Sequence, residues 1–101
     1  MILAVDNGIV AFVHYVYILR CADRTFYTGY ARDPKARVRL HNMGRGARYT
    51  SGRRPVCLVY SEAFRSIGDA LRREYELKRL PKARKEALVA SSRPGRARRP
   101  T

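Results

Sequence analysis

Two short β-prone runs separated by a polar turn constrain the fold of this chain more than any other feature. The runs span residues 15–19 and 26–30, and Ala22-Asp23-Arg24 lies between them, a pattern that predicts a β-hairpin. Tyr17 lies in the first run, within Tyr-Val-Tyr, and Tyr27 lies in the second, within Tyr-Thr-Gly. Because side chains alternate between the two faces of a strand, an even register across the turn would place both tyrosines on one face.

A helix is predicted directly after the hairpin. Asp33 is suited to cap its N-terminus and Pro34 to occupy its first turn. Arg37 and His41 are four residues apart, so they share one face of this helix. We expect an adjacent apolar stripe to hold the helix against the sheet. This stripe consists of Ala36, Leu40 and Met43.

The charge of the chain points to a polyanionic partner. Its 101 residues carry a formal net charge of +14 and allow one domain with a modest core. Such an imbalance destabilises a compact state through self-repulsion, which a polyanion relieves. Nucleic acid is the leading candidate. An anionic membrane is a minor alternative, because the sequence lacks a cationic amphipathic helix with large apolar anchors.

A glutamate in a second predicted helix is the most informative residue of the second half. Ser66, with Asp69 three residues later, predicts the start of this helix. Glu74 falls in the middle of its apolar stripe, whereas Glu76 projects to the opposite side. The stripe consists of Ile67, Ala70, Leu71 and Leu77. A carboxylate on a buried face needs a compensating cation or hydrogen bonds, and the residues alone leave an ion pair with an arginine and a metal ligand equally open.

Four elements, in this order and spacing, resemble the GIY-YIG nuclease superfamily and most of all its small standalone members. They are Tyr-Val-Tyr at 15–17, Tyr-Thr-Gly at 27–29, Arg37 ten residues after the second tyrosine, and Glu74. The resemblance covers residues 15–89. It implies an α/β (α+β) fold in which helices flank a three-stranded, mainly antiparallel sheet. It also implies a divalent-metal-dependent endonuclease that hydrolyses phosphodiester bonds in DNA.

The same resemblance implies the residues of the active site, which are Tyr17, Tyr27, Arg37, His41 and Glu74. Glu74 would bind Mg²⁺ or Mn²⁺, since magnesium often takes only one or two carboxylates together with phosphate oxygens. Arg37 would hold the scissile phosphate, and Tyr17 or Tyr27 would orient or deprotonate the attacking water. Because an unperturbed phenol is a poor base at neutral pH, we expect the metal and Arg37 to favour its phenolate form.

The sequence departs from the family pattern at three positions. The glycine of the first motif is Tyr15 here, and the isoleucine of the second motif is Thr28. A lysine that some members carry shortly after the second tyrosine is Tyr30. None of these changes removes a proposed catalytic side chain, but they leave open which residue acts as the base.

An arginine-rich loop provides candidate contacts to nucleic acid. Residues 44–54 contain four arginines and no acid, and a solvated loop is the simplest interpretation of such a run. Arginines also neutralise phosphates, and an aromatic face can stack on an unpaired base. Together with the resemblance, this favours contact with nucleic acid. The candidates are Arg45, Arg48, Tyr49, Arg53, Arg54 and Lys78.

Substrate selection is expected to be loose. Larger members of the family attach a separate domain that selects the DNA site, and this sequence contains none. We therefore expect weak sequence specificity and a preference for single-stranded or branched DNA over plain duplex, with RNA left open. The alternative is a non-catalytic basic module that binds RNA or ribosomes on the same scaffold. Glu74 favours the enzyme, because such a module gains nothing from a carboxylate buried beside phosphate.

The chain is predicted to have three parts. Residues 1–13 form an N-terminal extension, expected to be an extra segment or an edge strand. Residues 14–90 form the nuclease-like domain, and residues 91–101 form a basic tail that is expected to be disordered. Within the domain, the apolar run 56–60 predicts a third strand covered on both faces, and a last helix is predicted at 82–90.

The cysteines and the apolar N-terminus bear on where the protein is located. Cys21 and Cys57 lack metal-ligand spacing and are interpreted as small buried hydrophobic residues. Polar residues interrupt the apolar stretch 1–19, and no basic residue precedes it, which disfavours a membrane span. We therefore expect a cytoplasmic protein.

Overall fold

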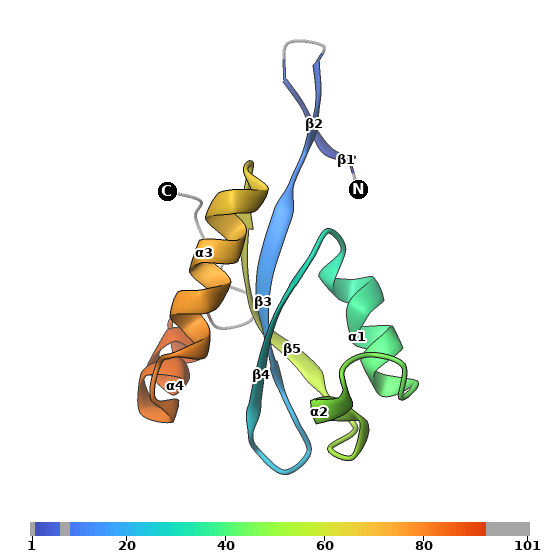
Figure 1. Cartoon of the computed structure of the whole chain (residues 1–101), viewed down its shortest axis with the longest axis vertical. Coiled ribbons are helices and arrows are strands. Elements are labelled where there is room, and N and C mark those ends of the chain that lie inside the picture. The colour runs from blue at the N-terminus through green and yellow to red at the C-terminus, as the bar shows by residue number, and fades with distance from the viewer. Residues whose placement is uncertain (1, 7–8, 93–101) are drawn as a thin grey trace.

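The main sheet is three-stranded and antiparallel, as predicted. The computed structural model describes residues 2–6 and 9–92, with side chains from residue 13 onward. Strands β3 (His14–Arg20), β4 (Phe26–Ala31) and β5 (Cys57–Phe64) lie in the order β4-β3-β5. Strand β3 is therefore central, and its pairing with both neighbours builds the platform on which all the helices rest (Figure 1).

The register of the β3–β4 hairpin confirms the predicted placement of the two motif tyrosines. Tyr17 pairs with Gly29, and Leu19 pairs with Tyr27. Because these four residues occupy one face of the pleated sheet, Tyr17 and Tyr27 are diagonal neighbours. Their ring centroids lie 6.4 Å apart.

The N-terminal segment forms a hairpin of its own. Strands β1 (Ile2–Asp6) and β2 (Ile9–Phe12) pair antiparallel in a separate two-stranded sheet, and β2 continues toward β3 (Figure 1). The alternative of an edge strand on the main sheet is therefore wrong. The sequence carried a signal for this hairpin, because Asn7-Gly8 between two apolar runs is the strongest short-range hairpin indicator. The predicted basic tail from residue 93 onward lies outside the described residues.

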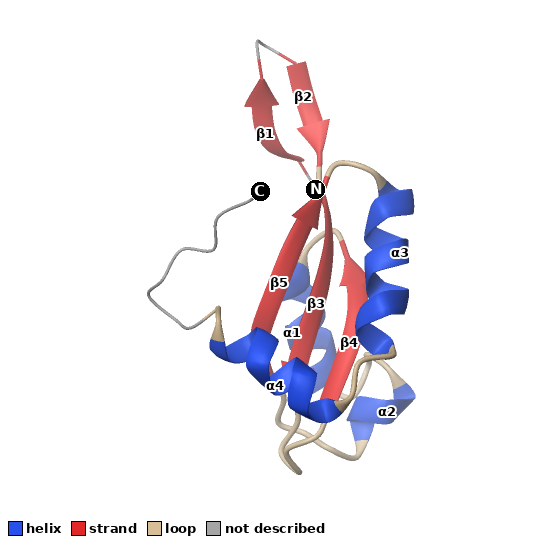
Figure 2. Ribbon diagram, turned by 90° about the vertical axis from the view of Figure 1, so that its left-hand side faces the viewer, coloured by secondary structure: helices blue, strands red, loops and turns tan. Residues whose placement is uncertain are grey.

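Helices cover both faces of the main sheet. They are α1 (Pro34–Asn42), α2 (Arg48–Ser51), α3 (Ile67–Lys78) and α4 (Lys82–Ala90). Figure 2 shows α1 behind the sheet, α4 in front of it and α3 alongside the edge formed by β4. One core contains Val16 and Ile18 with Leu77 of α3. The other contains Tyr17 and Leu19, with Val38 of α1 packed against it.

The predicted helix starts are confirmed by their caps. The Asp33 carboxylate accepts a hydrogen bond from the Ala36 amide at 3.2 Å, and Ser66 Oγ accepts one from the Asp69 amide at 3.3 Å. Both contacts satisfy amide groups that have no partner within the first turn of a helix. The last helix occupies the predicted residues, whereas the short α2 within the arginine-rich loop was not predicted.

The apolar stripe predicted for α1 is wrong at its end. Met43 is 59% exposed, because α1 ends at Asn42 and Met43 forms its C-cap. The buried residues of this helix are instead Pro34 and His41, seven residues apart on one face. The face that packs on the core therefore carries His41 and Val38 and differs from the predicted stripe.

The stripe predicted for α3 is half correct. Ala70 and Leu77 are buried, but Ile67 and Leu71 are 50% and 45% exposed. The helix packs on β3 and β4 through Ala70 and Leu77, which contact Val16 and Ile18 of β3, so only a narrow line of its surface is covered. Glu74 lies on this line, between the two buried residues, as the helical period predicts.

The third strand is less buried than its composition suggested. Val56, just before β5, and Tyr60 within it are buried, whereas Cys57 is exposed. Strand β5 is an edge strand, which leaves its first residue open to solvent. Cys21 is buried as predicted. Within residues 2–6 and 9–92, the helices are all too short or too polar to cross a bilayer.

Candidate active site

The side chain of Tyr17 passes over the edge strand at Gly29. A Cβ atom added to Gly29 would lie 2.6 Å from Tyr17 Oη and 2.7 Å from Cζ, closer than real contacts allow. The Tyr17 ring therefore fills the space that any other residue would need at position 29. This close approach carries the phenol from the central strand across β4, and the residue itself remains fully buried.

Arg37 of α1 reaches the same place from the helix layer. Its guanidinium lies close enough to Tyr17 to lower the pKa of the phenol. Its Nε is buried and has no hydrogen-bond partner among the described residues. A buried donor without a partner is costly, so this group is poised for an acceptor that the fold itself does not supply.

His41 is not a surface residue but a fully buried one. Its Nε2 lies 3.1 Å from Tyr17 Oη, and its Nδ1 lies 2.7 Å from Thr50 Oγ1. The Ala47 amide also donates to Nδ1, at 3.3 Å. Short helix α2 and the loop before it thus hold the imidazole at the nitrogen that does not contact Tyr17. Thr50 could not be predicted from the sequence, because nothing distinguishes one threonine in a polar loop from another.

The contacts of His41 join Tyr17 to the loop before α2. Thr50 Oγ1, which lies 2.7 Å from Nδ1, also donates to the Ala47 carbonyl at 3.0 Å. Nε2 and Tyr17 Oη share a hydrogen bond at 3.1 Å. Burial, with a smaller effect of the Arg37 charge, lowers the pKa of His41 and keeps the ring neutral. His41 positions Tyr17, and both of its nitrogens are already engaged.

Arg37 lowers the pKa of Tyr17, as expected, but burial has the larger effect. Burial raises the pKa of Tyr17 above its ordinary value, and the Arg37 guanidinium opposes this only in part. The nearby carboxylate of Glu74 raises it further. The protein without substrate or metal therefore holds a neutral phenol at neutral pH.

Glu74 comes to this cluster from α3, on the other side of β4. Its side chain is 19% exposed, and Oε2 lies 3.4 Å from Lys78 Nζ one helical turn later. The predicted alternative partner was an arginine, and the observed one is this lysine. A single carboxylate at the margin of the core suits magnesium, which keeps most of its waters and adds phosphate oxygens of the substrate. The donor set thus fits such an ion.

Tyr27 completes the cluster. Its ring centroid lies 5.1 Å from that of His41 and 6.1 Å from that of Tyr49. The structure therefore brings together the residues that the sequence selected from two strands and two helices. They are Tyr17, Tyr27, Arg37, His41 and Glu74.

The arginines of the loop do not all face solvent freely. Arg53 Nε pairs with Asp23 at 2.9 Å, and its guanidinium lies 4.1 Å over the Tyr49 ring. The loop contains no acid, but the hairpin turn supplies one, and the sequence spacing could not reveal this. Arg45 and Arg48 are exposed.

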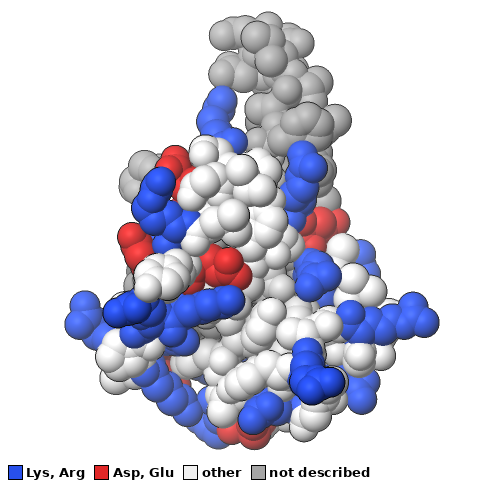
Figure 3. Space-filling model, viewed as in Figure 1, with Lys and Arg blue, Asp and Glu red and all other residues white. Residues whose placement is uncertain are grey.

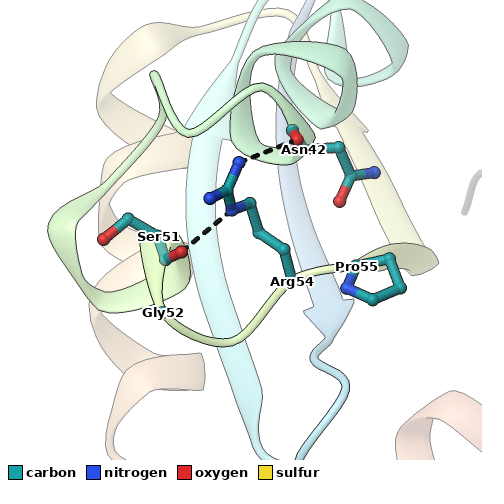
Figure 4. Close-up of a pocket in the computed structure, with 5 residues that line it drawn as sticks. All are labelled: Asn42, Ser51, Gly52, Arg54 and Pro55. Carbon is teal, nitrogen blue, oxygen red and sulfur yellow. Dashed lines mark hydrogen bonds between the residues drawn. The ribbon is translucent and has the colours of Figure 1, made fainter.

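Arg54 has a structural role behind the cluster. Its Nε donates to the Ser51 carbonyl at 2.9 Å and its Nη1 to the Asn42 carbonyl at 3.2 Å, which joins the ends of α1 and α2 (Figure 4). It lines a separate hollow with Gly52 and Pro55, and that hollow contains no member of the cluster. Arg54 therefore uses its donors to join elements of the fold, as Arg53 does in part through Asp23.

The burial of His41 predicts how stability depends on pH. An unfolded histidine has a pKa of about 6.5, whereas the folded state lowers the pKa of His41. The neutral ring thus contributes fully to the free energy of unfolding above about pH 6.5. As the pH drops below that value, the unfolded chain binds a proton more readily than the folded one, so the free energy of unfolding decreases. We expect the urea midpoint to fall between pH 7 and 5.

Two variants check this expectation. The fall should be much weaker in His41→Gln and should persist in His14→Gln, which changes a histidine that contacts Tyr30 instead. An unchanged fall in His41→Gln would contradict the assignment.

The comparisons with known proteins agree with this geometry. The family model described as GIY-YIG catalytic domain matches residues 13–87. A UPF0213 protein of Halobacterium salinarum is 53% identical over 76 residues, which are 75% of this chain and 99% of that protein. A UPF0213 protein of Staphylococcus aureus is 51% identical over 76 residues, 75% of this chain and 93% of that protein.

Solved structures show the same fold. The solution structure of a UPF0213 protein from Bacillus halodurans has a TM-score of 0.54 and 47% identity, and the match covers 82% of this chain and 88% of that one. A protein from E. faecalis has a TM-score of 0.56 and 34% identity, with 88% and 95% covered. Together with the arrangement of Tyr17, Arg37 and Glu74, these matches show that the chain belongs to the GIY-YIG catalytic domain family, among its small UPF0213 proteins.

Proposed function

We propose that this protein is a divalent-metal-dependent endonuclease that hydrolyses phosphodiester bonds in DNA. The observation that supports this most is the meeting of a buried arginine donor, a phenol and a carboxylate from separate elements at the β4 edge. Arg37 Nε lacks a partner in the described residues, and Glu74 lies close enough to Tyr17 to influence its pKa. A phosphate between Arg37 and Glu74 would supply the missing acceptor.

The proposed reaction is in-line hydrolysis. The oxygen of a water forms a bond to phosphorus, and the bond from phosphorus to the leaving oxygen breaks. Arg37 holds the phosphate and stabilises the charge that develops on its oxygens. Tyr17 orients the water and, once its own proton has left to solvent, accepts the proton of the water as a phenolate, while His41 holds the phenol ring in position through Nε2. Tyr27 borders the site and is the alternative candidate for the base.

Glu74 would hold the metal, Mg²⁺ or Mn²⁺, which when bound neutralises phosphate charge and favours ionised oxygen groups nearby. Such a charge opposes the effect of burial on Tyr17. The negative Glu74 side chain beside phosphate is otherwise unfavourable, and this is why we prefer an enzyme to a binding module for RNA or ribosomes.

We propose that the substrate is single-stranded or branched DNA in the cytoplasm, contacted through Arg45, Arg48, Tyr49, Arg53 and Lys78. These side chains border the cluster or lie in the arginine-rich loop, and they offer charge and one aromatic ring. Charge recognises the backbone and is indifferent to base sequence, so sequence specificity should be weak. Cleavage of branched or single-stranded DNA would suit a role in DNA repair.

The test is cleavage of end-labelled single-stranded, duplex and branched DNA, and of RNA, with Mg²⁺ or Mn²⁺. We expect cutting that stops when EDTA is added and returns with excess metal, and single-stranded or branched DNA should be cut faster than duplex. Tight binding to every substrate with cleavage of none, under either metal, would replace the enzyme with the binding module.

A further inference from the structure

A small groove opens beside the active-site cluster, between β4, α2, α3 and α4. Its lining residues are Phe26, Tyr27, Thr28, Tyr49, Lys78 and Lys85, and its volume is about 190 Å³. Pockets that enclose a whole small molecule measure about 300–1,000 Å³. The groove is thus sized for a part of a larger ligand, such as one residue of a polymer.

Thr28 gives this groove an unused polar group. The residue is 4% exposed, and its Oγ1 is buried with no hydrogen-bond partner in the described part of the chain. A buried hydroxyl without a partner destabilises the folded state. Because Thr28 is one of the residues that line the groove, a ligand bound there is the candidate partner for this hydroxyl.

Aromatic rings provide the second feature of the groove. Tyr49 is 40% exposed and is held by the Arg53 guanidinium, which lies 4.1 Å over its ring. Tyr27 lies next to it at a centroid distance of 6.1 Å, with the rings tilted by 31°. Fixed, partly exposed rings are the surfaces on which unpaired nucleic-acid bases stack.

Charge is the third feature. Lys78 and Lys85 line the groove, and Lys85 is partly buried, which lowers its pKa. No carboxylate forms an ion pair with Lys85 in the described residues. Figure 3 shows a largely uncharged strip along the middle of this face, where β4 runs, with basic side chains on both flanks and acidic ones among them on the α3 side. An uncharged strip with cations on both flanks suits a base with phosphates on either side.

We propose that this groove binds the unpaired base of a nucleotide next to the scissile phosphate. The base stacks on Tyr49 and Tyr27, Thr28 Oγ1 hydrogen-bonds to the nucleotide, and Lys78 and Lys85 contact its phosphates. A base within a duplex is already stacked and paired, so it cannot enter without flipping out. The inference rests on the proposed function for the position of the scissile phosphate, but binding of the base can be measured without cleavage.

The experiment compares two fluorescein-labelled oligomers of equal length, one of thymidylate and one abasic throughout. Both carry the same phosphates, so only the bases differ. Binding is measured by fluorescence anisotropy in EDTA, which removes the metal and stops any cutting. We expect loss of the bases to weaken binding to the unmodified protein by about 5- to 150-fold, since stacking contributes strongly for each base.

Variants locate the base in the groove. Tyr49→Leu should remove most of the difference between the oligomers, and Thr28→Val should reduce thymidylate binding by about two- to tenfold. Thr28→Val should also raise the urea midpoint, because it removes an unpartnered hydroxyl. The control is Tyr75→Leu, which changes another exposed tyrosine beside an arginine, Arg79 at 5.2 Å, outside the groove. It should keep the full difference.

The outcomes separate this inference from the proposed function. Equal binding of both oligomers, or a difference that survives in both groove variants, would overturn the base site even if the protein cuts DNA. A difference that disappears in Tyr49→Leu and shrinks in Thr28→Val would support the base site even if no substrate is cut.

Discussion

Replacing Glu74 with glutamine is expected to abolish cleavage while leaving DNA binding intact. The substitution keeps the shape of the side chain and removes the charge that a divalent cation requires. The Glu74 side chain is 19% exposed, and its carboxylate forms an ion pair with Lys78 at 3.4 Å. We expect cleavage to fall by at least about 10²- to 10³-fold, the effect of losing one group that stabilises charge in a transition state.

The measurement is single-turnover cleavage of the preferred DNA, together with binding in EDTA. Stability should change little, because the Lys78 side chain is 55% exposed and an ion pair one turn apart on a helix contributes only about 0.3–0.5 kcal/mol. The matched control is Glu76→Gln, two residues away on the same helix, where an exposed glutamate pairs with Arg73 at 3.1 Å. This control should cut at the normal rate.

Two results would contradict the role of Glu74. Cutting that survives Glu74→Gln would show that another group binds the metal or that the activity belongs to a contaminant. Equal losses of cleavage rate in the Glu74 and Glu76 variants would point to a general effect of helix charge on substrate binding. The affinity for DNA should then decrease in both variants as well.

Local sequence signals predicted most of the elements that carry the site. The alternation around Tyr17 and Tyr27 predicted a hairpin and its register, and capping residues such as Asp33 and Ser66 predicted where helices begin. Each of these signals depends only on residues close together in the sequence, so it can be recognised without the structure. The three-stranded fold followed from the resemblance to the family.

What the sequence did not predict depends on contacts between distant segments. The burial of His41 results from Thr50 and the Ala47 amide, which approach it from a later helix. The pairing of Arg53 with Asp23 joins the loop to the hairpin turn. Helical periodicity reports which residues share a face but not what covers that face, and this is why Met43 was assigned to the core.

The site therefore depends on how closely two side chains approach across the sheet. Tyr17 belongs to the central strand, while Glu74 lies on a helix beside the edge strand (Figure 2). The phenol meets these groups because its ring crosses β4 at the one residue without a side chain. Glycine at position 29 thus connects the strand pairing with the chemistry.

Gly29→Ala is accordingly expected to remove activity and to destabilise the fold. The new Cβ would lie 2.6 Å from Tyr17 Oη and 2.7 Å from Cζ, so the buried ring must move. Overpacking of this kind costs about 1–3 kcal/mol, and displacement of the phenol breaks its contacts with His41 and Arg37. Urea unfolding and the cleavage rate measure the two effects.

A second glycine and a second substitution test the cause. Gly52→Ala adds a Cβ that meets nothing within 4 Å, so it should leave stability and cleavage nearly unchanged. In a Tyr17→Leu background the ring is absent, and Gly29→Ala should then cost little further stability, since coupled residues show non-additive effects. A full additional loss in that background would mean that Gly29 is required by the strand itself. If instead the loss disappears, the clash with Tyr17 is the reason that position 29 must be glycine, and the active-site phenol and the edge strand have to be considered as one unit.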